Sequence, residues 1–237
     1  MAQSGDSGVM QKLRKFESFT ISLLLFRSAT ESLDKFRLCV NRDCLRVCDG
    51  HLWVRRGVMY CPQVLEVLTT GFHAKIFRFP HLGAGSCRLK RLHLNGVRLD
   101  CHFAEQIKSR CPLLEELELR SCVHMFQEVT SCSLKRLIID TLGNATKAPF
   151  VITAPCLVYF QMSVSVGCYT NGISVHITDS LLKAFVHLRS LENQRSLLVD
   201  LCNVPDLELR GFQTKVSLHR LVHVCSFMLQ VVIIFYF

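Results

Sequence analysis

The fold is decided by residues 111–122, Cys-Pro-Leu-Leu-Glu-Glu-Leu-Glu-Leu-Arg-Ser-Cys. Within this stretch Leu114, Leu117 and Leu119 follow the pattern L-x-x-L-x-L, and Cys122 comes three residues later. The alternating apolar positions form one face of a short strand, and the residues between them face the other way. One such strand cannot bury its leucines alone, so the pattern indicates a fold only if it recurs.

The pattern recurs at intervals of 20 to 25 residues, with matches that begin at Leu89, Leu114, Leu134, Leu157, Leu181 and Val204. A degenerate match begins at Leu65, where Thr70 takes the last apolar place, and another begins at Leu33, 32 residues before Leu65. Periods of 20 to 29 residues are typical of leucine-rich repeats. The sequence therefore predicts an α/β fold, a leucine-rich-repeat solenoid with one parallel concave sheet and short helices or turns on the convex side.

Three regions are predicted along the chain. Residues 1–30 contain an amphipathic helix over 9–26 that caps the solenoid, because Val9, Leu13, Phe16, Thr20 and Leu23 recur at helical spacing. Residues 31–211 hold the repeats, with the first strand over 33–40. Short helices are expected over 51–60 and 101–110, and after residue 150 a turn or a second short strand replaces the helix.

Residues 212–237 form the third region, an apolar C-terminal tail. Its last 17 residues contain no Lys, Arg, Asp or Glu. A membrane span needs about 20 apolar residues, and this run is interrupted by His223, Ser226 and Gln230. Membrane anchoring is therefore disfavoured, while a strand, a tail anchor and a disordered tail remain open.

Charge and cysteine content point to an intracellular protein without a specific nucleic-acid partner. The net charge is +9, but basic residues are spread thinly and form no stripe interleaved with aromatic residues. The 13 cysteines are odd in number and irregularly spaced, and residues 1–26 contain no signal-peptide pattern. A reducing cytoplasmic or nuclear location is expected.

Motifs for catalysis, metal binding and cofactor binding are absent from the sequence. It contains no C-x-x-C, G-x-S-x-G, P-loop or G-x-G-x-x-G. Cys39, Cys44, Cys48 and His51 are close in sequence, but their spacing matches no standard zinc finger. We expect Cys122 and Cys132 to be buried at strand ends and Trp53 to fill the core. The chain is predicted not to be an enzyme and to need no cofactor or metal.

The concave face is the predicted interaction surface, because its side chains alternate with the buried ones along each strand. The candidate partner-binding residues are Arg91, His93, Asn95, Glu116, Glu118, Arg120, Arg136, Asp140, Tyr159 and Gln161. In a parallel sheet they form two complementary rows, Arg91–Glu116–Arg136 and Asn95–Arg120–Asp140. Such rows can fix the register of the strands or hold a protein partner, and both interpretations remain open.

Several segments together resemble the plant F-box/leucine-rich-repeat proteins. They are Phe16-Glu-Ser-Phe-Thr-Ile-Ser-Leu-Leu-Leu-Phe-Arg27, Leu33-Asp-Lys-Phe-Arg-Leu38, Trp53-Val-Arg-Arg-Gly-Val58 and Cys111-Pro-Leu-Leu-Glu-Glu-Leu-Glu-Leu119, with Ala154-Pro-Cys-Leu-Val-Tyr159 and Ser180-Leu-Leu-Lys-Ala184 similar to later repeats. The resemblance spans roughly residues 10–210.

The resemblance implies the target-recognition part of an F-box subunit of a Skp–cullin–F-box ubiquitin ligase. No F-box helices precede Phe16, so this chain is not expected to bind a Skp-type adaptor. The alternative is an orphan or truncated leucine-rich-repeat interaction domain with no ubiquitin-ligase role.

Overall fold

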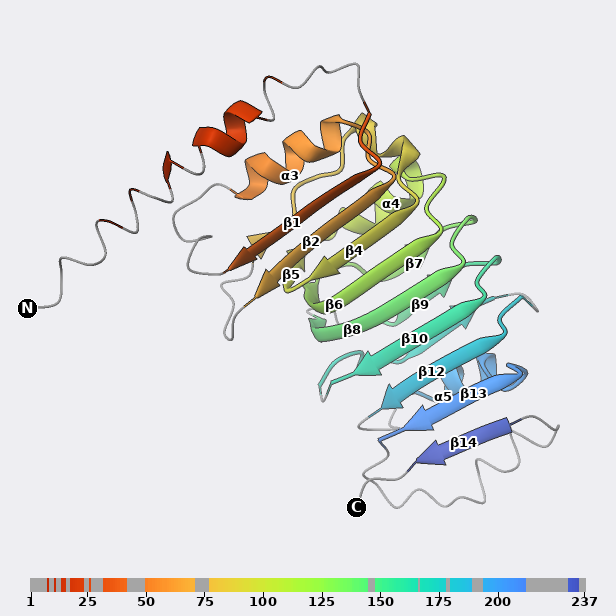
Figure 1. Cartoon of the computed structure of the whole chain (residues 1–237). Helices are drawn as coiled ribbons and strands as arrows, with labels where there is room; N and C mark the ends of the chain where they lie inside the picture. The colour runs from red at the N-terminus through yellow and green to blue at the C-terminus, as the bar shows by residue number, and fades with distance from the viewer. Residues whose placement is uncertain are drawn as a thin grey trace, which may run out of the picture.

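The long strands form one parallel sheet in chain order (Figure 1). The structure is a computed structural model that describes residues 32–41, 50–70, 77–144, 148–165, 167–177, 180–188, 194–211 and 230–234, and helical residues 8, 11, 14, 15, 18–23 and 26. The sheet order is β1 (Lys35–Asn41), β2 (Val64–Thr70), β4 (Arg91–Asn95), β6 (Glu116–His124), β8 (Arg136–Asn144), β10 (Tyr159–Val164), β12 (Lys183–Leu188), β13 (Asp206–Arg210) and β14 (Gln230–Ile234). The prediction of an α/β fold with a large parallel sheet is confirmed.

The recurring apolar residues occupy matching positions in this sheet. The backbone register aligns Leu92 with Leu117, Leu117 with Leu137, and Leu137 with Phe160. All four side chains are fully buried, and so are Leu114 and Leu119 from the deciding stretch. Because each strand turns its apolar residues to the same side, the core runs continuously behind the sheet.

The predicted phase of the match at Leu65 is wrong. Leu65 pairs in register with Leu92, and Val67 pairs with Leu94. Leu65 and Val67 are both fully buried, whereas Leu68 is only half-buried. The first apolar place of this match is therefore taken by buried Pro62 rather than by Leu65.

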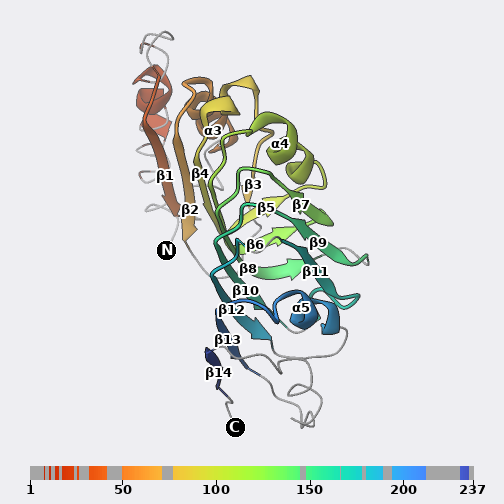
Figure 2. The same cartoon turned by 90° about the vertical axis from the view of Figure 1, so that its right-hand side faces the viewer.

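A second layer lies on one side of the large sheet (Figure 2). It contains α3 (Gly50–Met59), α4 (Phe103–Arg110), α5 (Arg195–Asp200), the 3₁₀ turn η1 (Ala84–Arg88), and a small parallel sheet of β7 (Glu128–Thr130), β9 (Phe150–Thr153) and β11 (Ile173–His176). The predicted helices over 51–60 and 101–110 are confirmed, with Trp53, Phe103 and Ile107 buried. After residue 150 the short strands β9 and β11 replace the helix as expected, but the expectation is wrong between β12 and β13, where α5 lies.

The connection after β4 depends on Gly96. Its backbone has φ +69°, and an added Cβ would meet Thr69 Oγ1, while that hydroxyl donates a hydrogen bond of 2.7 Å to the Gly96 carbonyl. Only glycine accepts both the left-handed conformation and this close approach. The turn leads into β5 (Val97–Leu99), which pairs with β6 and with β3 (Phe77–Arg78).

The two cysteines predicted to be buried differ. Cys122 has no exposed surface, and burial raises the pKa of its thiol to about 12. Cys132 is exposed, because it lies in the turn between β7 and β8 rather than in a strand. The prediction for Cys132 is therefore wrong.

Aromatic side chains fill the space between the two sheets. His124 stacks on Phe126, with ring centroids 4.3 Å apart, and it also contacts Phe150 and Tyr169. The Nε2 atom of His124 lies 2.5 Å from the Tyr169 hydroxyl, which is 3.2 Å from Thr141 Oγ1. This buried polar cluster is satisfied internally, as burial requires.

The two ends of the chain are described only in part. Residues 18–23 are helical as predicted, with Phe19 and Leu23 about 60% exposed, and the capping role of residues 1–30 stays a prediction. In the C-terminal region, β14 pairs in parallel with β13, while residues 212–229 and 235–237 lie outside the described residues. No helix in the described part of the chain is long and apolar enough to cross a membrane.

Candidate functional site

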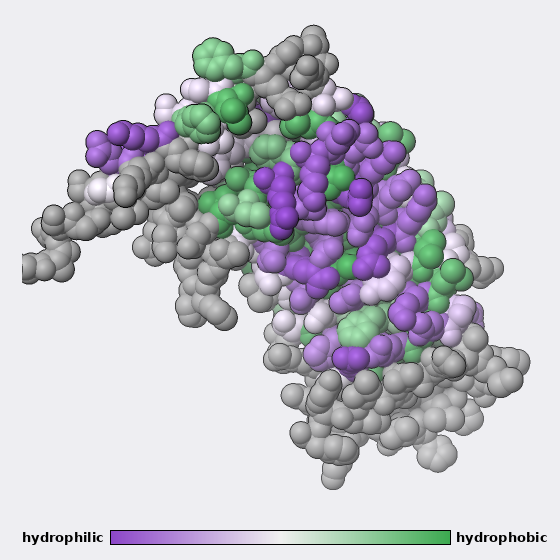
Figure 3. Space-filling view, viewed as in Figure 1, coloured by the Kyte–Doolittle hydropathy of each residue, from purple (hydrophilic) through white to green (hydrophobic). Residues whose placement is uncertain are grey.

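The candidate site is the open face of the large sheet, defined here as the outward side chains of β1, β2, β4, β6, β8, β10, β12 and β13. These side chains alternate with buried ones, as the burial of β4, β10 and β13 illustrates. Helices α3, α4 and α5 and the small sheet lie on the other side (Figure 2). Hydrophilic residues gather over the middle strands of this face (Figure 3).

All ten predicted residues lie on the open face, and the two predicted rows exist in the backbone register. Glu116 pairs with Arg91 on one side and with Arg136 on the other. Arg120 likewise lies between Asn95 and Asp140. Strand register is set by the buried leucines, so the outward rows follow directly from the apolar pattern.

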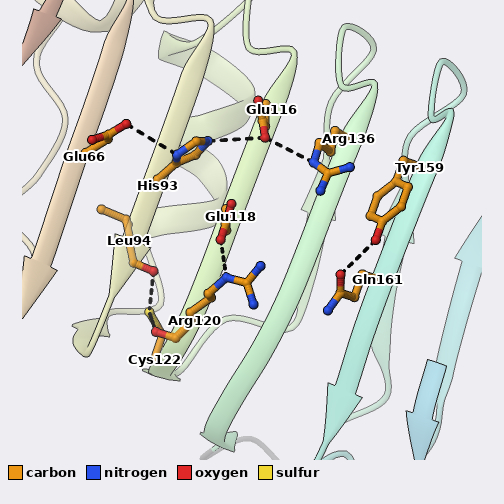
Figure 4. Close-up of polar contacts among 10 residues, drawn as sticks. All are labelled: Glu66, His93, Leu94, Glu116, Glu118, Arg120, Cys122, Arg136, Tyr159 and Gln161. Carbon is orange, nitrogen blue, oxygen red and sulfur yellow. Dashed lines mark hydrogen bonds and ion pairs between the residues drawn. The ribbon is translucent and has the colours of Figure 1, made fainter. Parts of the chain in front are cut away.

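A continuous polar network crosses five strands from β2 to β10 (Figure 4). His93 lies between two carboxylates, with Nδ1 3.8 Å from Glu66 Oε1 and Nε2 3.4 Å from Glu116 Oε1. Glu116 Oε1 is also 3.2 Å from Arg136 Nε. The Arg136 guanidinium then lies 3.9 Å from the centre of the Tyr159 ring.

The network ends at Tyr159, whose hydroxyl donates a hydrogen bond of 2.9 Å to Gln161 Oε1. A guanidinium over a tyrosine face is a cation–π contact, and it holds the ring in a fixed orientation. The alternation along β8 places Ile138 on the open face, yet its side chain is fully buried. Its neighbours in register on the two adjacent strands are Glu118 and Gln161. The centre of the open face therefore presents a fixed aromatic ring beside charged groups.

The side-chain pairing differs from the predicted rows in two places. Arg120 forms its ion pair with Glu118 of the same strand rather than with Asp140 of the next strand. Among the described residues, neither Arg91 nor Asp140 has an ion pair. Long side chains choose among several neighbours in register and along the strand, and register alone does not fix that choice.

Sequence reasoning missed Glu66, which anchors one end of the network. Its Oε1 is 2.7 Å from Lys35 Nζ, and its Oε2 is 3.2 Å from Arg37 Nε. The hydrogen bond from Lys35 holds the pKa of the Glu66 carboxyl below its usual value, against the opposing effect of burial. If Leu65 had been aligned with Leu92 of the next strand, the alternation would have placed Glu66 on the open face.

The later strands of the open face were also missed. The Arg210 guanidinium lies 5.0 Å from the centre of the Phe185 ring, and Arg210 forms an ion pair with Glu208. The same arrangement occurs in Glu118 and Arg120, because Leu-Glu-Leu-Arg stands at both 117–120 and 207–210. This repeated tetrapeptide could have identified Glu208 and Arg210 as residues of the open face.

One group of side chains has the donor atoms for a metal ion. The ligand atoms of His93, Glu116 and Glu118 all lie within 4.8 Å of one another. However, Glu116 already contacts Arg136, and Glu118 contacts Arg120. A divalent cation would have to displace two guanidiniums from these carboxylates, so the charge balance favours an ion-pair network over a metal centre.

Comparison with known proteins adds no relative. A scan against protein-family models, a search of curated proteins and a search of solved structures each found no match.

Proposed function

We propose that the chain is a leucine-rich-repeat solenoid whose open face binds a protein partner. The observation that carries this proposal is the network from Glu66 to Gln161, which spans five strands on the open face. The spacing of the apolar pattern and the in-order parallel strands support the repeat architecture.

A protein partner fits this surface better than a nucleic acid does. Acidic and basic groups alternate across it, with Glu66, His93, Glu116 and Arg136 in succession, whereas a phosphate backbone requires a basic surface. Tyrosine and arginine are enriched in the energetically dominant centres of protein interfaces. Complementary charges around such a centre select the partner and set its orientation.

The resemblance to the plant F-box/leucine-rich-repeat proteins suggests a role for the binding of a partner. In this proposal the chain is similar to the target-recognition part of a ubiquitin-ligase subunit, acts without catalysis, and works in the cytoplasm or nucleus. The alternative is an interaction domain with no role in a ubiquitin ligase, and on either view the open face is the binding surface.

Reversing two charges tests the open face. Glu116→Lys together with Glu118→Lys replaces two carboxylates of the network with ammonium groups, and should remove a partner captured by the immobilised chain from plant-cell extract. The matched control is Glu105→Lys with Glu128→Lys, which makes the same charge change at exposed positions of α4 and β7. A partner retained by both variants would contradict the proposal, provided that both unfold at similar denaturant concentrations.

Mixing the purified chain with a Skp-type adaptor tests whether the chain itself is a ligase subunit. The described part of the chain contains no separate helical module beside the sheet, so we expect the two proteins to elute separately in size-exclusion chromatography. A chain carrying an F-box fused ahead of Val9 should co-elute with the adaptor. Co-elution of the unmodified chain would instead support a direct role as a ligase subunit.

A further inference from the structure

A pocket of about 430 Å³ lies on the other side of the large sheet from the network. Its lining comes from the beginning of α3, from β3 and β5 with the residues after them, and from the residue that follows β6. Strands β3 and β5 belong to the large sheet but lie off its main path, on the side that carries α3 and α4 (Figure 2). The volume is within the range of small-molecule sites, about 300–1,000 Å³.

Two arginines stand side by side in this pocket. Arg78 of β3 pairs in backbone register with Arg98 of β5, and both side chains are exposed. Like charges directly opposite each other in a sheet are destabilising. An arrangement that holds two guanidiniums together is thus suited to an anion that neutralises them both.

The described carboxylate in the lining does not neutralise the arginines. That group is Asp100, and its Oδ2 lies 3.0 Å from His81 Nε2. Arg98 instead directs Nη2 to the sulfur of Met125 at 3.6 Å, which is a weak acceptor. Among the described residues, Arg78 has no ion pair at all.

The remaining lining combines imidazole donors with an apolar floor. His51 is stacked on Phe77, with ring centroids 4.7 Å apart, so its ring is held in place. Phe79 is buried and packs edge-on against Phe103 of α4. Together with Met125 it gives the pocket an apolar surface beside the two guanidiniums.

From this geometry we propose that the pocket binds a small phosphate monoester whose phosphoryl group is attached to an apolar, ring-sized body. The phosphoryl oxygens accept hydrogen bonds from Arg78 and Arg98, because the guanidinium fork matches phosphate geometry. The apolar body lies against Phe79 and Met125. The site is separate from the open face and does not depend on the protein-binding proposal.

Calorimetric titration of the full chain tests the site, with phenyl phosphate, inorganic phosphate and benzoate as the probes. Phenyl phosphate should bind at least tenfold more tightly than either of the others, because it alone supplies both the dianion and the ring. Arg78→Gln with Arg98→Gln should weaken phenyl phosphate binding at least tenfold. The matched control, Arg110→Gln with Arg195→Gln, removes the same charge at exposed positions of α4 and α5 and should bind as the original chain does.

Each result decides the proposal. Equal binding by the two double variants would show that Arg78 and Arg98 contribute no more than other exposed arginines, and would overturn the site. Tighter binding of benzoate would overturn the phosphate assignment, and no binding of any probe would overturn the pocket as an anion site. Since Arg78 and Arg98 are exposed, both variants should melt within a few degrees of the original chain, which keeps the comparison valid.

Discussion

His124 is an ionisable side chain inside the aromatic core, where it has no exposed surface. Burial lowers the pKa of its imidazole from 6.5 to about 4, although the backbone carbonyl of Phe126 partly opposes this. The folded chain therefore takes up the proton less readily than the unfolded chain does. Stability from the neutral ring is complete above pH 6.5 and is lost as the pH falls towards 4.

Acidification should destabilise the fold through this residue. A lowering of the His124 pKa from 6.5 to about 4 corresponds to a loss of about 3 kcal/mol, at 1.36 kcal/mol per pKa unit. Urea unfolding at pH 7, 5.5 and 4.5 measures how the free energy of unfolding falls with pH. His124→Phe should be less stable at pH 7, because the contact with the Tyr169 hydroxyl is lost, but its stability should depend less on pH. Parallel pH dependence of the two proteins would rule out His124 as the source.

At the same scale, the sequence predicts the direction of side chains far better than their partners. Alternation with buried leucines placed all ten predicted residues on the open face. Alternation did not predict that Arg120 would pair with Glu118, because Glu118 on the same strand and Asp140 on the next strand are both neighbours of Arg120. Glu66 was missed because Pro62 replaces the first leucine of its match and moved the predicted phase by three residues.

At the scale of elements, each strand depends on the buried leucines that align it with its neighbours. Leu117 is fully buried and lies in register between Leu92 and Leu137. We expect Leu117→Asp to unfold the chain, because it forfeits about 3 kcal/mol of leucine packing and several kcal/mol more for an unpaired buried carboxylate. Circular dichroism during thermal melting measures the loss.

Glu118→Gln is the matched control for this prediction, because it changes the next residue of the same strand on the opposite face. It removes the ion pair with Arg120, and such a partly exposed pair contributes about 1 kcal/mol or less. A cooperative melt of Leu117→Asp at the same temperature as Glu118→Gln would be incompatible with the register described above.

Long elements were predictable because their periods are visible over several residues. The helices over 50–59 and 103–110 and the strands around each leucine pattern were found in this way. Strands β3, β5 and β7 contain only two or three residues, which is too few for an alternation to be recognised. In the described sheets β5 pairs with the long strand β6, but β3 pairs with β5, and β7 pairs with the four-residue β9. The pocket between β3 and β5 could not be predicted for the same reason.

At the scale of the whole molecule, the described part of the large sheet ends in two strands, β1 and β14, that differ in charge. On the first edge, β1 carries Lys35 and Arg37, both paired with Glu66. Charged residues of this kind, lysine above all, oppose edge-to-edge association. At the other end of the described sheet, β14 has the sequence Gln-Val-Val-Ile-Ile, with no charged residue.

We therefore expect the chain to self-associate through β14 with increasing concentration, which sedimentation velocity can measure. Val232→Lys should shift the distribution towards the monomer, because a lysine in an edge strand opposes edge-to-edge pairing. Val199→Lys introduces the same residue at an exposed position of α5 and should leave the association unchanged. If the two variants sediment alike, the association does not depend on β14, and the prediction is wrong.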